Sequence, residues 1–175
     1  MPYEEYDGVV YDLDGTLVDL VVDWGVVAAD VEAVYEEAGI DPGRRSLWDL
    51  LEAARGHDLF DEVNEAIAAH EREGARESRR LPLADELAAL DRPAAVCSLN
   101  CAEACTVALA EHGLEEYVAA VVGRDTVATW KPDPESLLAA VEATGADPSR
   151  AVFVGDSERD ARAAERAGVD FVYVD

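Results

Sequence analysis

The chain has 175 residues, half of them hydrophobic, which is enough for one well-buried globular core with a small additional subdomain. It carries 39 acidic and 14 basic residues, a formal net charge of −25, and this charge argues against nucleic acid or an anionic membrane as a partner. No apolar run approaches the length of a membrane span, and the N-terminus is acidic where a secretory signal would be basic. We therefore expect a cytoplasmic protein.

The basic residues are arginines with one exception, Lys131. Together with the acidity, this composition resembles that of proteins from organisms that keep molar salt in their cytoplasm, although a merely acidic protein remains the alternative. The three cysteines, Cys97, Cys101 and Cys105, are spaced by four, and an odd number without a secretory signal argues against a disulfide framework. We expect them to be small apolar core residues.

The first apolar run, residues 9–13, is interrupted only by Asp12 and is followed by Gly15. It predicts a buried strand that delivers Asp12 and Asp14 to a turn at its carboxyl end. Two carboxylates held this close repel each other unless one is protonated or a cation lies between them. Asp-Gly is also common in turns, so this stretch alone leaves open a strand that simply ends in a polar turn.

The next stretch, residues 18–80, shows helical periodicity only, and we expect no strand in it. Helices are expected over residues 23–39, from a cap at Ser46 to a break at Gly56, and from Asp58 into the charged stretch near residues 76–80.

From residue 81 onward, strands alternate with helices. Strands are expected at residues 93–99, 119–123, 151–155 and 169–174, and helices near residues 83–90, 102–112, 133–144 and 157–167. This alternation predicts a parallel sheet with helices on both faces, in which ligands bind beyond the carboxyl ends of the strands. We therefore predict an α/β fold with a Rossmann-like core (residues 1–17 and 81–175) and a small all-helical insert (residues 18–80) after the first strand.

Polar side chains collect at four places along this predicted sheet edge. They are Asp12 with Asp14, Ser98 with Asn100, Lys131, and Asp156 with Asp160. A hydroxyl, an ammonium and several carboxylates suit a phosphate and a divalent cation, and Mg²⁺ prefers oxygen ligands. Taken singly, Ser98 could end a strand, and Asp156 and Asp160 could cap a helix. Lys131 is harder to explain structurally, because it is a compact ammonium in a chain that otherwise uses arginine.

The same four segments read Asp12-Leu13-Asp14-Gly15-Thr16-Leu17, Ser98-Leu99-Asn100, Lys131-Pro132-Asp133-Pro134 and Gly155-Asp156-Ser157-Glu158-Arg159-Asp160. In this order they resemble the four motifs of the haloacid dehalogenase superfamily, and the resemblance covers nearly the whole chain. The chain is most similar to phosphoglycolate-phosphatase-like members, in which the insert is a helical cap. The resemblance implies a Mg²⁺-dependent phosphatase that acts on a small phosphomonoester, such as phosphoglycolate or a sugar phosphate.

The resemblance also implies roles for the acidic residues. Asp12 would attack phosphorus and form an aspartyl-phosphate, while Asp14 would protonate the leaving oxygen and then activate water. Mg²⁺ would be held by the Asp12 carboxylate, the Asp14 backbone carbonyl and Asp156. Asp160 would support this coordination sphere from outside or through water.

Ser98, Asn100 and Lys131 would hold the phosphoryl group, and the partner would be a small phosphorylated metabolite. A phosphomutase is one alternative, although Thr16 lies where phosphomutases of the family typically have valine. A non-catalytic phosphate-ligand binding protein and a receiver-type signalling domain are the others. The oligomeric state is expected to be a monomer or a weak homodimer.

The cap would choose the substrate. Arg44 and Arg45, in the turn between its first two helices, could bind a substrate carboxylate, or they could simply be solvated loop residues. We expect Trp24 and Trp48 in the core of the cap, and Trp130 at the entrance of the site.

Overall fold

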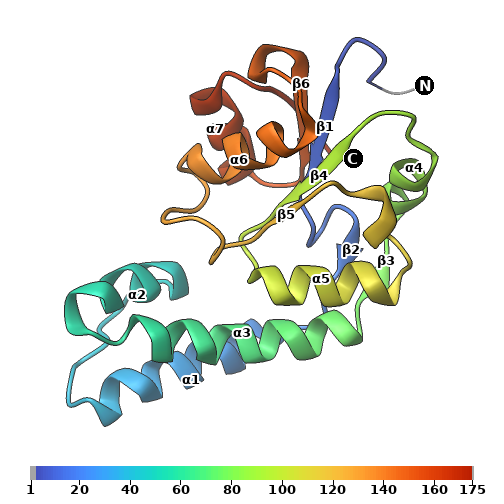
Figure 1. Ribbon diagram of the computed structural model, residues 1–175. Coiled ribbons are helices and arrows are strands. Elements are labelled where there is room, and N and C mark those ends of the chain that lie inside the picture. Colours follow the sequence, from blue (N-terminus) through green and yellow to red (C-terminus); the bar gives the residue numbers. More distant parts are fainter. Residues whose placement is uncertain (1–2, 175) are drawn as a thin grey trace.

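A five-stranded parallel sheet forms the centre of the protein in the computed structural model, which describes residues 3–174 (Figure 1). The strand order is β5–β4–β1–β6–β7, so that β1 (Gly8–Tyr11) lies in the middle. The other four strands are β4 (Ala94–Cys97), β5 (Val121–Val122), β6 (Ala151–Gly155) and β7 (Asp170–Tyr173). Because the strands are parallel, their carboxyl ends meet at one edge, and the predicted α/β sheet is confirmed.

Helices cover both faces of this sheet, as predicted. One face packs against α4 (Leu83–Ala89) and α5 (Ala102–Glu111), and the other against α6 (Glu135–Thr144) and α7 (Glu158–Ala167). Val9 and Tyr11 of β1 point into the first of these cores and Val10 into the second, since strand side chains alternate. Burial on both sides explains why the strand sequence is almost continuously apolar. Cys101 and Cys105 are buried free thiols in the first core, as expected.

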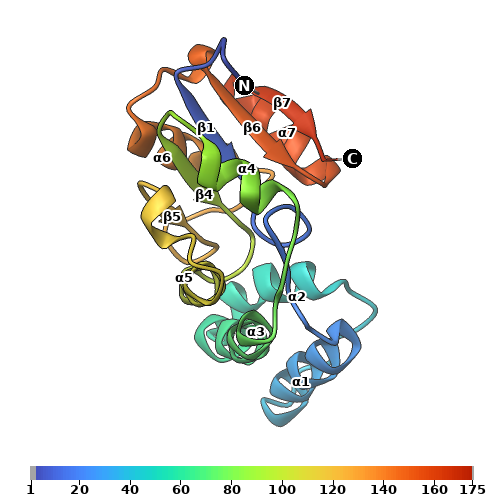
Figure 2. The same ribbon diagram turned by 90° about the vertical axis from the view of Figure 1, so that its right-hand side faces the viewer.

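The insert after β1 contains three α-helices, with a short 3-10 helix (Arg55–His57) after the second, and they form a helical cap beside the core (Figure 2). They are α1 (Trp24–Glu37), α2 (Leu47–Ala54) and α3 (Phe60–Arg76). The Asp23 side chain caps α1, and the Ser46 hydroxyl caps α2 by accepting from the backbone N–H of Asp49. The helices enclose a small hydrophobic core made of Val27, Val31, Tyr35, Leu50, Leu51, Ala54, Val63 and Ile67.

The prediction that residues 18–80 contain no strand is wrong. The two ends of this stretch pair with each other as β2 (Val18–Asp19) and β3 (Arg79–Arg80), in antiparallel orientation. Each strand has only two residues and pairs with a distant segment, so the sequence carries no periodic pattern that would reveal it. The pair brings together the points where the chain enters and leaves the insert.

The last helix of the insert, α3, lies alongside α5 of the core in both views (Figures 1 and 2). Its N-terminal half belongs to the hydrophobic core of the insert, whereas Ala68 and Ala75 pack into the core that covers the sheet. Gly74 allows close approach, since a Cβ there would lie 2.6 Å from the Val21 carbonyl oxygen. α3 therefore joins insert and core. Within residues 3–174, no helix is long and apolar enough to cross a membrane.

Candidate active site

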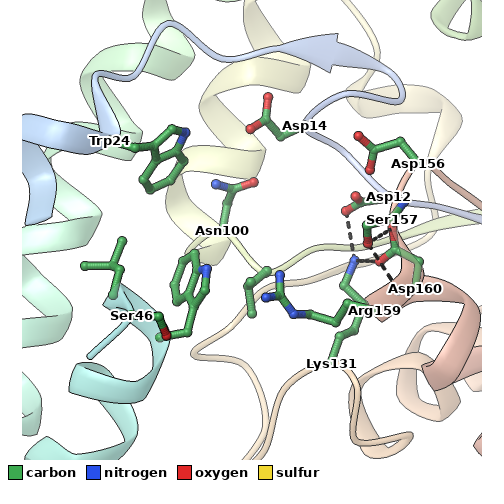
Figure 3. Close-up of a pocket in the computed structure, with 13 residues that line it drawn as sticks. Asp12, Asp14, Trp24, Ser46, Asn100, Lys131, Asp156, Ser157, Arg159 and Asp160 are labelled. Carbon is green, nitrogen blue, oxygen red and sulfur yellow. Dashed lines mark hydrogen bonds and ion pairs between the residues drawn. The ribbon is translucent and has the colours of Figure 1, made fainter. Parts of the chain in front are cut away.

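A pocket of about 480 Å³ lies between the carboxyl edge of the sheet and the insert (Figure 3). Its core side is formed by Asp12, Asp14, Leu99, Asn100, Lys131, Asp156, Ser157, Arg159 and Asp160. Its insert side is formed by Trp24, Ser46, Leu47 and Trp48. The topology thus brings four segments that are distant in the sequence to one place.

Lys131 lies at the centre of the core side. Its Nζ donates to Asp12 Oδ1 at 3.0 Å, to Asp160 Oδ1 at 2.5 Å and to the backbone oxygen of Cys97 at 3.1 Å. Burial lowers the pKa of Lys131, but the two carboxylates outweigh this effect and raise the pKa above its ordinary value. Lys131 is therefore a fixed cation, held by all three of its N–H donors.

Asp160 connects Lys131 to the start of α7. Besides its contact with Lys131, its Oδ2 accepts hydrogen bonds from the backbone N–H and the hydroxyl of Ser157. Ser157 and Asp160 form a reciprocal capping box at the start of α7. Both carboxylate oxygens of Asp160 are thereby engaged by protein groups.

The carboxylates of Asp12, Asp156 and Asp160 fit a divalent cation. Each offers an oxygen, and these oxygens lie within 4.8 Å of one another. Because Asp160 is engaged elsewhere, Asp12 and Asp156 are the better placed donors. Gly15, at φ +78°, makes room for Asp156, since a Cβ there would lie 2.2 Å from Asp156 Oδ2. Burial raises the pKa of Asp12 to about 7 despite the nearby Lys131, and a cation would lower it again.

Asp14 lies in the same pocket and is oriented from the side of the insert. Its Oδ1 accepts a hydrogen bond of 2.8 Å from the backbone N–H of Leu20, in the segment that leads into α1. Burial raises the pKa of Asp14 to about 6. A carboxyl group with this pKa can both donate and accept a proton near neutral pH.

Ser98 and Asn100 do not occupy equivalent positions. Asn100 lines the pocket, whereas Ser98 is buried and does not line it. The Ser98 hydroxyl donates to Asn100 Oδ1 at 3.0 Å and accepts from the Asn100 backbone N–H at 3.1 Å. In this conformation, Ser98 orients Asn100.

A buried ion pair between α3 and the loop after β5 was missed in the sequence. Glu71 Oε1 lies 2.7 Å from Arg124 Nη1, and both side chains are fully buried. Glu71 also accepts from Asn100 Nδ2 and from the backbone N–H of Cys101, so the insert is bonded to the loop that lines the pocket. The spacing of residues could have indicated that Glu71 is buried, because it lies four residues after Ile67 and eight after Val63, on the apolar face of its helix.

The insert side of the pocket differs from the prediction. Arg44 and Arg45 are exposed and do not line the pocket. Trp24 and Trp48 do line it, with ring centroids 6.1 Å apart, and Trp24 is 37% exposed, so placing it in the core of the insert was wrong. Trp48 also packs against the small hydrophobic core of the insert, which agrees in part with the prediction, whereas Trp24 is not among the residues that contact that core.

Trp130 precedes Lys131 but does not line this pocket, contrary to the prediction. Its ring stacks on Phe60 of the insert, with centroids 6.1 Å apart and an angle of 17° between the planes. The Arg55 guanidinium lies 4.0 Å from the Phe60 ring and 5.0 Å from the Trp130 ring. These three side chains form a second connection between the insert and the core.

Fold and site together define a class of hydrolase with a Rossmann-like core, an acidic site at its strand ends and a helical cap after the first strand. The family model for haloacid dehalogenase-like hydrolases matches residues 9–174, and the chain belongs to this family.

Similar proteins agree with this assignment. The chain is 33% identical to phosphoglycolate phosphatase of Mesorhizobium japonicum, covering 95% of this chain and 82% of that protein. It is 29% identical to fructose-1-phosphate phosphatase of Escherichia coli, covering 98% of each. A solved structure of a HAD-superfamily hydrolase from Geobacter sulfurreducens is 28% identical, with a TM-score of 0.64 over 96% of this chain and 89% of that one.

Proposed function

We propose that the protein is a Mg²⁺-dependent phosphatase that hydrolyses a small phosphomonoester through an aspartyl-phosphate. The observation that carries this proposal is the meeting of Asp12, Asp14, Lys131 and Asp156 in one pocket beside the helical insert. The two phosphatases similar to this chain are named for phosphoglycolate and for fructose 1-phosphate, which supports a small phosphorylated metabolite as substrate.

In the first step, a carboxylate oxygen of Asp12 attacks phosphorus and the bond from phosphorus to the ester oxygen breaks. Asp14 donates its proton to that leaving oxygen, which departs as an alcohol. Lys131, held by Asp12 and Asp160, offsets negative charge beside the transferring group. When bound by Asp12, Asp156 and the Asp14 carbonyl, Mg²⁺ would supply further positive charge there.

In the second step, Asp14 takes a proton from a water molecule, and the water oxygen attacks phosphorus. The bond between phosphorus and Asp12 breaks, which releases inorganic phosphate and regenerates the carboxylate. The hydrogen bond from Leu20 N–H keeps Asp14 directed at the pocket through both steps. Asn100 lines the pocket, and its amide group, which contacts Ser98 and Glu71, would bind the phosphoryl oxygens with its remaining N–H.

Residues 18–80 act in this proposal as the cap that excludes water and selects the substrate, and residues 1–17 and 81–175 as the catalytic core. The other expectations, a cytoplasmic location and a monomer or weak homodimer without nucleic acid or membrane partners, stay predictions.

The test is phosphate release from a panel of small phosphoesters with Mg²⁺, compared with added EDTA and with Asp12→Asn. We expect release that is lost with EDTA and in Asp12→Asn, and restored when excess Mg²⁺ follows EDTA. A phosphomutase would return the phosphoryl group to a sugar phosphate without net release. A receiver-type domain would accumulate a long-lived phosphoprotein, and a binding protein would bind the ester without turnover.

A further inference from the structure

Arg159 extends from the start of α7 into the pocket, toward the side formed by the insert (Figure 3). Its guanidinium carbon lies 5.9 Å from the centre of the Trp48 ring. Apart from this ring contact, Arg159 has no hydrogen bond or ion pair within residues 3–174. Arg159 also lines a second hollow, with Pro132 and Arg162, but its donors are free to bind an anion that enters the pocket beside Trp48.

Arg44 and Arg45 also have no hydrogen bond or ion pair within residues 3–174, but both are exposed, whereas Arg159 is half-buried in the pocket of a chain with 39 acidic residues. Arg162, one turn along the same helix, pairs with Glu158, and Arg150 pairs with Asp7 at the surface. The acidic residues of the pocket do not pair with Arg159 either, because Asp12 and Asp160 contact Lys131 instead. This arrangement favours an external anion as the partner of Arg159.

Lys131 and Arg159 are the two basic residues that line the pocket. Lys131 already donates to two carboxylates and a carbonyl, whereas Arg159 keeps its donors free. Contact with the Trp48 ring restricts the guanidinium while leaving its edge open, and a guanidinium edge matches an oxyanion in a bidentate manner. The remaining residues of the insert side are Trp24, Ser46 and Leu47, which carry no charge.

We propose that Arg159 is the specificity-determining residue of this pocket and binds a second anionic group of the substrate, a carboxylate or a second phosphate. This inference rests on the proposed function, in which the phosphoryl group lies at Asp12 and Lys131. Arg44 and Arg45 of the insert are the residues that the sequence suggests for binding a substrate carboxylate, and this proposal gives the anion-binding role to Arg159 of the core instead. The volume of about 480 Å³ is large enough for a small substrate that carries two anionic groups.

The kinetic test compares kcat/KM for pairs of esters that differ in the second group. Phosphoglycolate and ethyl phosphate test a carboxylate, and propanediol bisphosphate and propyl phosphate test a second phosphate. For each pair, the ratio is kcat/KM of the ester with two anionic groups divided by kcat/KM of the ester with one. In Arg159→Gln, we expect this ratio to fall roughly 10- to 100-fold for the pair that carries the correct second group, which is the range for a lost charge-assisted hydrogen bond. The pair whose ratio falls identifies the second group.

Two controls separate this role from a structural one. Arg162→Gln removes a neighbouring exposed arginine of α7, and the double variant Arg44→Gln/Arg45→Gln removes the arginines of the insert. Neither is expected to change the ratio. An unchanged ratio in Arg159→Gln, or an equal fall in the Arg44→Gln/Arg45→Gln variant, would overturn the proposal.

A binding measurement keeps the test independent of turnover. In the Asp12→Asn background with Mg²⁺, titration with the four esters is followed by tryptophan fluorescence, since Trp24 and Trp48 line the pocket. Adding Arg159→Gln is expected to weaken binding of one doubly anionic ester selectively, by the same factor as in the kinetics. Equal weakening of all four esters, or none, would contradict the role of Arg159. Absence of hydrolysis by the wild type with selective binding intact would instead refute the phosphatase and leave Arg159 as an anion-binding residue.

Discussion

The core side of the pocket and the insert side hold their residues by different means. On the core side, Asp12 and Asp156 directly follow β1 and β6, neighbouring strands whose register is set by backbone hydrogen bonds. On the insert side, Trp24 and Trp48 belong to two helices positioned by side-chain packing around a small hydrophobic core. On the core side, a change at the exposed Asp156 should therefore affect chemistry with little loss of stability, whereas a change in the buried Lys131 pairs should affect both. Changes where the insert meets the core should mainly affect stability.

The largest expected effect is on the core side. Asp156→Asn removes a proposed Mg²⁺ ligand, and we expect kcat/KM at limiting Mg²⁺ to fall by about 100-fold or more. Asp156 is exposed and lies among other carboxylates, so its neutralisation should not lower the free energy of unfolding. The matched control is Glu158→Gln, two residues further on, which should leave the Mg²⁺ dependence unchanged. A similar loss in both variants would contradict the assignment of Asp156.

The next largest effect is expected where the insert meets the core. Glu71→Gln leaves the buried Arg124 guanidinium without its counter-charge, and we expect the free energy of unfolding to fall by about 3–5 kcal/mol. The measurement is urea denaturation. Glu73→Gln on the same helix breaks an exposed pair with Arg76 and should cost less than about 1 kcal/mol. An equal loss of unfolding free energy in the two variants would contradict the claim that burial makes the Glu71–Arg124 pair more stabilising than the exposed pair.

The smallest effect is expected at the second connection of the insert. A double-mutant cycle with Phe60→Leu and Trp130→Leu should give a coupling free energy of about 0.5–1.5 kcal/mol, because the rings stack across the interface. A coupling near zero in urea denaturation would show that the stacking does not hold insert and core together.

Much of the core could be predicted from the sequence because its signals are local. Apolar runs such as residues 151–155 identify strands, and Gly145 and Gly168 end α6 and α7 in the left-handed conformation. In a parallel sheet, order along the chain then brings the polar strand ends to one edge. This reasoning located the pocket and most of its polar core-side residues, although it did not single out Arg159 and it placed Ser98 in the pocket. The adaptation to molar salt rests on composition alone and stays a prediction.

The insert side could not be predicted because its contacts are not local. β2 and β3 are too short to show a pattern and pair across the whole insert. Whether Trp24 faces the hydrophobic core or the pocket depends on how α1 packs against the other helices, which periodicity does not reveal. Arg159 lies inside a motif that the sequence analysis quoted, but the role proposed for it depends on its lack of a hydrogen bond or ion pair within residues 3–174, which the sequence does not show.

The most direct measurement of the proposed mechanism follows phosphate release and phosphorylation of the peptide that contains Asp12 in the same acid-quenched samples. The wild type, Asp14→Asn and Asp12→Asn are compared with Mg²⁺ present. With an aryl phosphate such as p-nitrophenyl phosphate, the leaving group departs without a proton from Asp14. For this substrate the mechanism predicts release by the wild type, a phosphorylated Asp12 peptide that accumulates in Asp14→Asn because water is no longer activated, and neither signal in Asp12→Asn. Phosphate release by Asp12→Asn at the rate of the wild type would contradict it.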